Sequence, residues 1–328
     1  MLPLLPMSQA AATNYVFTTS GTSPDRGSVA TDVNDAGTVV GYQYDYNSSA
    51  SRAFVYAGGI KTNLAGPSGA ISVDLSGITN SGLMVGNYST TWVDDGTGTG
   101  TNIPGPSSIF RLSNGVYSDI SIPGLPTAFV NAISSNSRWI VGNVFDDQGR
   151  GRGFAFDTLP GGVVTVFGGS AANVIAAGIN NLGMVVGYDR TFVVGVGNFG
   201  PAWTFDLTTN QRTEINVAGS PRTGARNITD AGVISGYYYT SIRPAVAHGF
   251  TGLGSNFEFF DVPGASQTFI LGGNDLGALV GYYYDAGFNQ GAFLAVPVPE
   301  PAVVWLLVAG LAGLATHRRR SALPATRA

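Results

Sequence analysis

The sequence predicts an all-β fold built from six similar units, and three observations support this prediction. The motif NDAGTVVGY, residues 34–42, returns five more times along the chain. The closing glycines of the six copies are 45, 56, 45, 49 and 45 residues apart, which indicates a unit of about 45 residues with two insertions. Each copy joins the turn formers Asn, Asp and Gly to β-branched and aromatic residues. Self-similarity at this period is typical of repeat folds. The six glycines are Gly41, Gly86, Gly142, Gly187, Gly236 and Gly281.

The first unit shows how the repeat divides into strands. Residues 28–33 predict a strand and NDAG at 34–37 its turn, because these residue types tolerate left-handed backbone. A second strand follows at 38–46, and a third at 52–59 ends in a Gly-Gly hairpin signal before a fourth strand that starts at Ile60. Four strands joined by short turns predict one antiparallel sheet per unit. The glycine inside each second strand indicates close approach of a neighbouring backbone.

The two ends of the array indicate how it closes. After residues 291–296 the sixth unit has no fourth strand, whereas residues 14–21 match a fourth strand with no third strand before it. Placing the N-terminal strand beside the last unit closes a ring and removes free sheet edges. A β-solenoid needs capping ends and gives no reason for the split unit. We therefore predict a six-bladed β-propeller over residues 14–296, with the insertion at 93–106 as a flexible surface loop.

The repeated strands resemble those of the bacterial HAF-repeat family of propellers. In that pattern a strand with Asn and two glycines precedes a His-Ala-Phe strand, and the resemblance covers roughly residues 14–296. It implies a repeat architecture and brings no known catalytic residues. The matching residues are Asn34, Gly37, Gly41, Arg52, Ala53 and Phe54 in the first unit, and Ile228, Gly232, Gly236, Ala247, His248 and Phe250 in the fifth.

Charge and cysteine content exclude several classes of function. Residues 1–301 carry 12 basic and 20 acidic side chains. Such an acidic body lacks the excess of basic residues with which proteins bind the phosphates of nucleic acid. The chain has no cysteine, which rules out disulfides, thiolate metal sites and a cysteine nucleophile. The compartment stays open, since an oxidising compartment permits disulfides without requiring them.

Both ends of the chain carry signals for export. Residues 1–13 combine a short apolar run with small residues, which predicts a residual signal peptide or, alternatively, a disordered leader. Residues 302–316 are apolar and uncharged, and the arginine cluster 318–320 that follows is a cytoplasmic-side signal. We expect a hydrophobic helix over 302–316 that is short for a membrane span.

The order Pro-Glu-Pro, apolar helix and arginine cluster resembles the PEP-CTERM sorting signal of Gram-negative bacteria, here over residues 297–328. The resemblance implies an inner-membrane-anchored precursor, recognition by an exosortase-type sorting protease, and release to the cell surface or the exopolysaccharide matrix of a biofilm. Cleavage of the tail stays open, and an ordinary tail anchor is the alternative. The matching residues are Pro299, Glu300, Pro301, Arg318, Arg319 and Arg320.

Signals for an enzyme are few. The chain has only two histidines, His248 and His317, so it has few residues from which a catalytic triad or a His-based metal site could be built. The acidic pairs at 94–95 and 146–147 lie in predicted loops, where adjacent carboxylates are more often solvated than catalytic. We expect no enzymatic activity, no metal and no cofactor, with a polysaccharide-processing hydrolase or lyase as the alternative.

The tyrosines are the best candidates for ligand binding. An aromatic ring with a hydroxyl offers an apolar body and a polar tip, which suits a sugar or a protein surface. We expect Tyr46, Tyr239 and Tyr284 to be candidate ligand-binding residues, with Tyr46 and Tyr284 the more exposed. The alternative for a Tyr directly after a repeated Gly is packing between blades. The predicted function is an exported, surface-associated propeller that binds extracellular polysaccharide or a matrix protein, or has a structural role.

Overall fold

The structure is a computed structural model that describes most of the repeat array. Its contacts group Phe17–Val296 as one compact unit. No helix among the described residues is long and apolar enough to cross a membrane. The apolar residues 302–316, where the sequence predicts a helix, lie outside the described residues. The described residues are 15–19, 27–46, 48–94, 102–146, 149–168, 173–190, 192–193, 197–198, 200–217, 220, 222–242 and 245–298.

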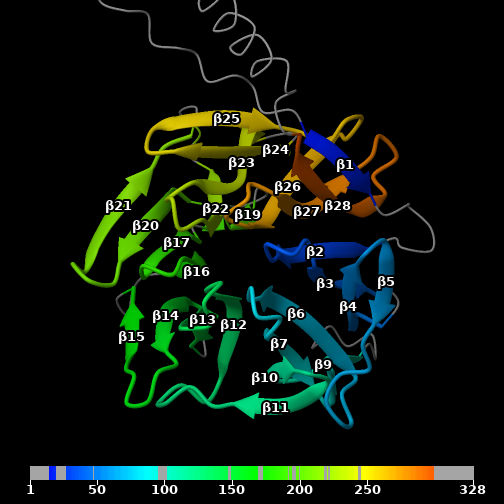
Figure 1. The fold of residues 1–328 in the computed structure, drawn as a ribbon, viewed down its shortest axis with the longest axis vertical. Helices are drawn as coiled ribbons and strands as arrows, with labels where there is room; N and C mark the ends of the chain where they lie inside the picture. Colours follow the sequence, from blue (N-terminus) through cyan, green and yellow to red (C-terminus); the bar gives the residue numbers. More distant parts are fainter. Residues whose placement is uncertain are drawn as a thin grey trace, which may run out of the picture. The chain divides into compact units, whose positions relative to one another are not determined.

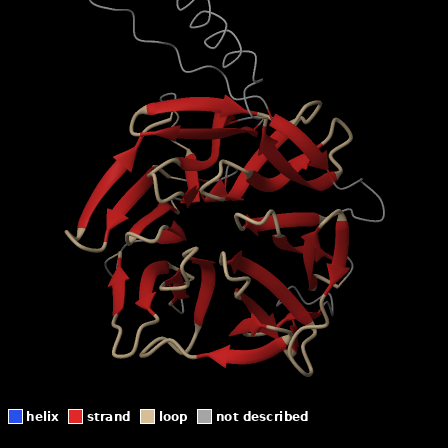
Figure 2. Cartoon of the chain, in the orientation of Figure 1, coloured by secondary structure: helices blue, strands red, loops and turns tan. Residues whose placement is uncertain are grey.

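The repeat array forms six four-stranded antiparallel sheets, or blades, arranged as a ring (Figures 1 and 2). The first strand of each blade lies innermost in the ring. Blade 1 contains β2 (Ser28–Val33), β3 (Val39–Tyr44), β4 (Ser51–Ala57) and β5 (Ile60–Asn63), and blade 2 contains β6 (Ser72–Ile78), β7 (Met84–Ser89), β10 (Ser108–Ser113) and β11 (Val116–Ile120). Blade 3 contains β12 (Ala128–Ile133), β13 (Trp139–Phe145), β14 (Gly151–Asp157) and β15 (Val164–Phe167), and blade 4 contains β16 (Val174–Ile179), β17 (Met184–Asp189), β20 (Ala202–Asp206) and β21 (Gln211–Ile215). Blade 5 contains β22 (Thr223–Ile228), β23 (Ile234–Ile242), β24 (Ala245–Leu253) and β25 (Asn256–Phe260), and blade 6 contains β26 (Gln267–Gly273), β27 (Leu279–Tyr284) and β28 (Gln290–Pro297) together with β1 (Tyr15–Thr19).

The sixth blade closes the ring. Its strand order is β1-β28-β27-β26, so the N-terminal strand supplies the outer strand that the last unit lacks. Because one sheet holds both ends of the array, the ring is closed by main-chain hydrogen bonds without a covalent link. The prediction of a six-bladed propeller closed by the N-terminal strand is confirmed.

Each repeated glycine lies where no side chain fits. A Cβ at these six positions would fall 1.8–2.1 Å from a carbonyl oxygen of the inner strand. On the third strand, the residue paired with the glycine is aromatic and buried in every blade. The missing side chain therefore makes room both for a close backbone and for an aromatic ring. The six rings belong to Phe54, Phe110, Phe154, Trp203, Phe250 and Phe293.

A β-bulge in each inner strand begins at the residue paired with that glycine. A bulge adds one residue to its strand and re-aims the side chain. All six bulged residues line the central channel, one from each blade. The repeat thus places one bulged residue per blade at an equivalent position along the channel. The type of residue at that position differs from blade to blade. They are Thr31, Ser76, Asn131, Ala177, Arg226 and Leu271.

The NDAG-type turns join the blades at one end of the channel. Within a turn, the Asn34 side-chain oxygen accepts a hydrogen bond from the Thr38 amide at 3.0 Å. Between turns, a hydrogen bond crosses every blade junction, so the turns form a closed ring. The bonds run from Asn34 Nδ2 to Thr79 O (3.2 Å), Asn80 N to Ser135 O (3.0 Å), Asn136 N to Asn181 Oδ1 (2.9 Å), Asn180 Nδ2 to Thr229 O (3.1 Å), Asp230 N to Asp275 Oδ1 (2.7 Å) and Asn274 Nδ2 to Asn34 O (2.9 Å).

Two extra hairpins interrupt the repeat. The insertion at 93–106, predicted as a flexible loop, includes a short antiparallel pair, β8 (Trp92–Asp94) with β9 (Asn102–Pro104). The prediction of a flexible surface loop did not include this strand pair, and residues 95–101 between the two strands lie outside the described residues. Blade 4 carries a second hairpin, β18 (Phe192–Val193) with β19 (Gly197–Asn198). Both connect the second strand of a blade to its third strand.

Candidate functional site

The channel has two chemically different ends. We call the end with the NDAG-type turns the turn end. The opposite end, where the second strand of each blade connects to its third strand, is the loop end. The loop end also carries the two extra hairpins and the connections between blades. Loops held by a rigid scaffold are where binding residues concentrate, so the loop end is the first place to look for a site.

A pocket of about 440 Å³ opens at the loop end between blades 3, 4 and 5. Its volume is within the range of about 300–1,000 Å³ that is usual for small-molecule sites. Its lining combines three aromatic residues and an isoleucine with two asparagines, and the charged groups that the described residues contribute are two arginines. The lining residues are Phe129, Asn131, Asn143, Phe145, Ile175, Tyr188, Arg190 and Arg226.

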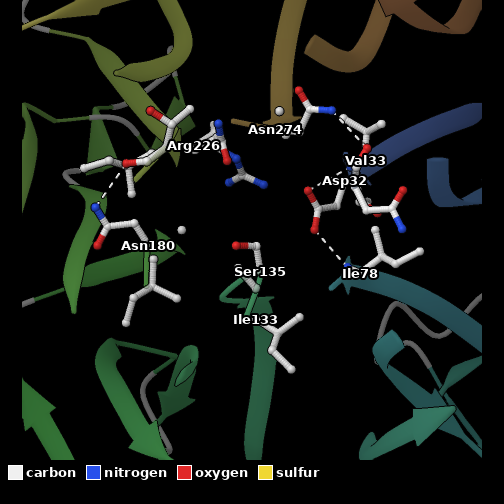
Figure 3. A pocket seen from close by; sticks show the side chains of 18 of the residues that line it. Asp32, Val33, Ile78, Ile133, Ser135, Asn180, Arg226 and Asn274 are labelled. Atoms are coloured by element: carbon white, nitrogen blue, oxygen red, sulfur yellow. Dashed lines mark hydrogen bonds between the residues drawn. The ribbon is translucent and has the colours of Figure 1, made fainter. Parts of the chain in front are cut away.

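Arg226 is the bulged residue of β22 and extends toward the middle of the channel (Figure 3). It lines both the loop-end pocket and the narrow space at the turn end. Its Nη1 donates a hydrogen bond to the Tyr188 hydroxyl at 3.3 Å. Its Nε is buried and has no hydrogen-bond partner among the described residues. None of the ion pairs within that part of the chain involves Arg226.

Arg190 follows β17 and is half-buried at the wall of the same pocket. Its guanidinium carbon lies 5.8 Å from the centroid of the Phe145 ring. The neighbouring Asp189 does not pair with it, because that carboxylate forms an ion pair with Arg212 at 2.7 Å. The pocket thus holds two guanidinium groups for which the described carboxylates provide no partner within ion-pair distance.

A belt of tyrosines surrounds Arg226 from four blades. Tyr42, Tyr188, Tyr237 and Tyr282 each follow the repeated glycine, and all four contribute to the electrostatic environment of the guanidinium. Burial raises the pKa of Tyr42 to about 12 and also raises the pKa of Tyr237 and Tyr282, so these three hydroxyls stay neutral. They surround the arginine with polar groups but do not neutralise its charge.

Asparagine replaces tyrosine at the same position in blades 2 and 3. The Asn87 side chain exchanges two hydrogen bonds of 2.9 Å with the peptide of Val130 in the next blade. Asn143 donates to Val174 O of the following blade at 2.7 Å. Each of these residues thus ties the second strand of its blade to the inner strand of the next blade. The smaller Asn143 also leaves room for the pocket, which it lines.

The three tyrosines predicted as ligand-binding residues do not line this pocket. Tyr46 is 55% exposed, whereas Tyr284 is half-buried, so the expectation of exposure is correct for Tyr46 only. Both donate to Gln290 Oε1, at 3.2 and 3.1 Å. The Tyr239 ring lies under the Arg222 guanidinium, 4.3 Å from its centroid. Their role in binding stays a prediction. Sequence reasoning missed Arg190 and Arg226, and the signal was a basic residue at a position where other copies have none.

The turn end is narrow and acidic. The free volume there is about 50 Å³, enough for a few water molecules. Asp35, Asp230 and Asp275 lie around it, and burial raises the pKa of Asp275, with the negative charges of the other two adding to the rise. The channel is therefore polarised, with acidic groups at the turn end and guanidinium groups at the loop end.

Asp32 lies on the channel wall between blades 1 and 2 (Figure 3). Its two oxygens accept hydrogen bonds from the amides of Val33 at 2.8 Å and Ile78 at 2.9 Å. Burial raises the pKa of this carboxyl to about 7, and the two amide hydrogen bonds reduce the rise. In blade 2, burial raises the pKa of Asp74 to about 6, with an opposing effect from a hydrogen bond to Ser51.

Other candidates for chemistry are surface features. His248 Nδ1 lies 2.7 Å from Asp261 Oδ2 on blade 5. Asp146 forms a surface ion pair with Arg150 at 2.8 Å, and Asp94 is exposed. The residues that the structure describes include no group of three or more His, Cys, Asp or Glu side chains that could hold a metal ion. The second member of each predicted acidic pair lies outside the described residues.

Solved structures with a similar fold are distant in sequence. TolB from Acinetobacter baumannii is 8% identical, with coverage of 79% of this chain and 64% of that one and a TM-score of 0.47. A lectin from Aleuria aurantia, solved with Fucα1-6GlcNAc, is 12% identical, with coverage of 84% and 98% and a TM-score of 0.47. A Trypanosoma rangeli sialidase, solved with the inhibitor DANA, is 10% identical, with coverage of 92% and 59% and a TM-score of 0.47. No curated protein matches the sequence.

A protein-family model matches the C-terminal segment. Residues 297–320 fit the model of the PEP-CTERM protein-sorting motif, as the resemblance predicts. This motif is a signal for exosortase processing. It implies a secreted, membrane-anchored precursor destined for the cell surface. The residues of the motif from Pro299 onward lie outside the described part of the chain, and the HAF-repeat resemblance stays a prediction. The chain is therefore a six-bladed β-propeller that carries a PEP-CTERM sorting motif at residues 297–320.

Proposed function

We propose that this protein binds extracellular polysaccharide at the loop-end pocket and acts as a binding or structural protein of the cell surface or its matrix. The observation that carries the proposal is the pocket of about 440 Å³, with aromatic walls and two guanidinium groups that the described carboxylates leave unpaired. Aromatic faces stack on sugar rings, and arginine forks donate to their oxygens.

The sorting motif supports a ligand that lies outside the cell. A protein delivered to the cell surface meets the polysaccharides and proteins of the surrounding matrix. The hydrogen bonds between blades also support binding, because the turn ring and the side chains of Asn87 and Asn143 tie each blade to the next. Such preorganisation lowers the entropic cost of binding.

An enzyme that processes polysaccharides is the second candidate, and the raised pKa of Asp32 and Asp74 is the observation that favours it. A carboxyl with a pKa near 6–7 suits a general acid. Two observations oppose this role for Asp32. Both of its oxygens already accept backbone hydrogen bonds, and the channel beside it has a free volume of only about 50 Å³.

Retention on polysaccharide tests the proposal. The propeller, residues 14–296, would be passed over the immobilised exopolysaccharide of its own host and over a panel of other glycans and matrix proteins. We expect retention by at least one polysaccharide and no shortening of the glycan on prolonged incubation. Retention by none would remove the binding role, and release of shorter products would favour the enzyme.

A further inference from the structure

The charge of the loop-end pocket restricts the class of saccharide that it accepts. The body of the protein is acidic, with 20 acidic and 12 basic side chains in residues 1–301. Against this background, Arg190 and Arg226 are the only charged residues among the described residues that line the pocket. A half-buried cation without a counter-ion loses part of its hydration, and neutral neighbours replace that loss only in part, so a ligand of opposite charge stabilises it.

Arg226 has the geometry of an anion-binding group. Among the described residues, its Nη1 donates to the Tyr188 hydroxyl, and its Nε is buried without a partner. The tyrosines around it keep their protons, because burial raises the pKa of Tyr42, Tyr237 and Tyr282. The positive charge is therefore undiminished by its neighbours. A planar guanidinium with free donors matches the two oxygens of a carboxylate.

The rest of the pocket suits a sugar ring. The aromatic residues Phe129, Phe145 and Tyr188 line the pocket, together with the amides of Asn131 and Asn143. The Asn143 amide already bonds the Val174 carbonyl, and Asn131 donates to Ala176 O at 2.7 Å. Both amides are therefore held rigidly, so they shape the pocket rather than adapt to the ligand.

We propose that the loop-end pocket binds a carboxylated saccharide, a uronic acid unit of an acidic polysaccharide, with Arg226 and Arg190 as the residues that pair with its carboxylate. This inference rests on the proposed function and specifies its ligand class. Two arginines beside aromatic walls match one carboxylate per sugar. A free phosphate would use the guanidinium groups but leave the aromatic walls uncovered.

The test measures binding of uronic acid oligosaccharides to the full-length chain in detergent by calorimetry. The probes are trimers of galacturonate, glucuronate and mannuronate, the methyl esters of the same trimers, and inorganic phosphate. The ester keeps the sugar and removes the charge. We expect at least one acid trimer to bind. Its methyl ester should bind more weakly by at least about ten-fold, because hydrogen bonds to charged groups are strong.

Charge-removing variants identify the residues responsible. We expect Arg226→Gln and Arg190→Gln each to lower the affinity for the acid trimer by about ten-fold or more. The matched control is Arg111→Gln on the exposed face of β10, where Arg111 Nε donates to Ser118 at 2.9 Å, and it leaves the affinity unchanged. Thermal unfolding of each variant shows whether the fold is intact. If Arg226→Gln does not fold, the Arg190→Gln result decides, because that residue follows β17 and lies outside the inner strands.

The outcomes separate this inference from the proposed function. Equal binding of the ester and the acid, or unchanged affinity in folded arginine variants, overturns the carboxylate inference and leaves polysaccharide binding intact. Binding of phosphate with no binding of any trimer also overturns it. Failure of every acid trimer, together with no retention on any polysaccharide, removes both proposals.

Discussion

Substitution of a repeated glycine by alanine is expected to destabilise the propeller, and Gly187→Ala is the sharpest case. The new Cβ would lie 2.0 Å from the carbonyl oxygen of Ile175 and 2.6 Å from the Trp203 ring. Ordinary contacts at such a carbon are 3.4–4 Å, so the inner strand β16 must move by more than an ångström and the ring must shift as well. Overpacking of this kind costs about 1–3 kcal/mol and occasionally more. We expect the upper end, because one of the two neighbours is backbone.

Thermal and urea unfolding measure the effect. A loss of about 3 kcal/mol corresponds to a fall in Tm of about 6–12 °C if each kcal/mol shifts Tm by about 2–4 °C, as in domains near this size. The control is Gly82→Ala in a turn, where φ is +83° and no atom lies within 4 Å of the new Cβ. That variant meets only the left-handed backbone penalty, about 1–2 kcal/mol.

A second background shows which neighbour is responsible. Trp203→Phe makes room beside the ring but leaves the Ile175 carbonyl in place, so it should not rescue Gly187→Ala. Rescue by the smaller ring would show that ring crowding, rather than the backbone approach, requires the glycine. A loss below 1 kcal/mol for Gly187→Ala would refute the whole account of the repeated glycine.

Three further predictions follow from the turns, the channel and the tail. The pKa of Asp32 is about 7 in the fold against an ordinary 3.8, so its contribution to the free energy of unfolding is greatest below about pH 4 and is lost as the pH rises through 7. Asp32→Asn should flatten this part of the pH profile measured by urea unfolding, and an unchanged profile contradicts the prediction. Asn274→Ala removes the bond to Asn34 O and the two bonds that its side-chain oxygen accepts within its own turn, so unfolding should show a loss of about 1–3 kcal/mol. The control Asn63→Ala, at an exposed position of β5, should stay within about 0.5 kcal/mol. Alanine at residues 299–301 should leave the precursor in the membrane fraction when the cells are fractionated and immunoblotted, and unaltered release would contradict the sorting assignment.

The architecture was predictable because each repeat carries the same turn-forming and strand-forming residues at equivalent positions. The turn formers around Asn34 and the glycine at Gly41 recur at one period, and six copies average out local ambiguity. The ring closure was predictable as well, since a unit split between the two ends leaves one solution without a free sheet edge. Even the need for glycine could be inferred, although its contacts with a carbonyl and an aromatic ring could not.

The candidate site was not predictable in the same way. Attention to the repeated pattern led to Tyr46, Tyr239 and Tyr284, which lie outside the loop-end pocket. Arg190 and Arg226 are 36 residues apart in the sequence, and no local pattern indicates that they line one pocket. The hairpin of β8 and β9 was missed for a related reason, because its composition is typical of a flexible loop.

The sequence by itself determined the unit, the number of blades, the closure and the sorting motif, because these depend on local turn chemistry and periodicity. Only the tertiary structure decided what faces the channel. A β-bulge turns one residue of each inner strand inward, and the ring brings together residues that are distant along the chain. The chemistry of the pocket therefore depends on which side chain each copy places at its bulge and at the position after its glycine, and a pattern shared by all copies carries no information about such differences.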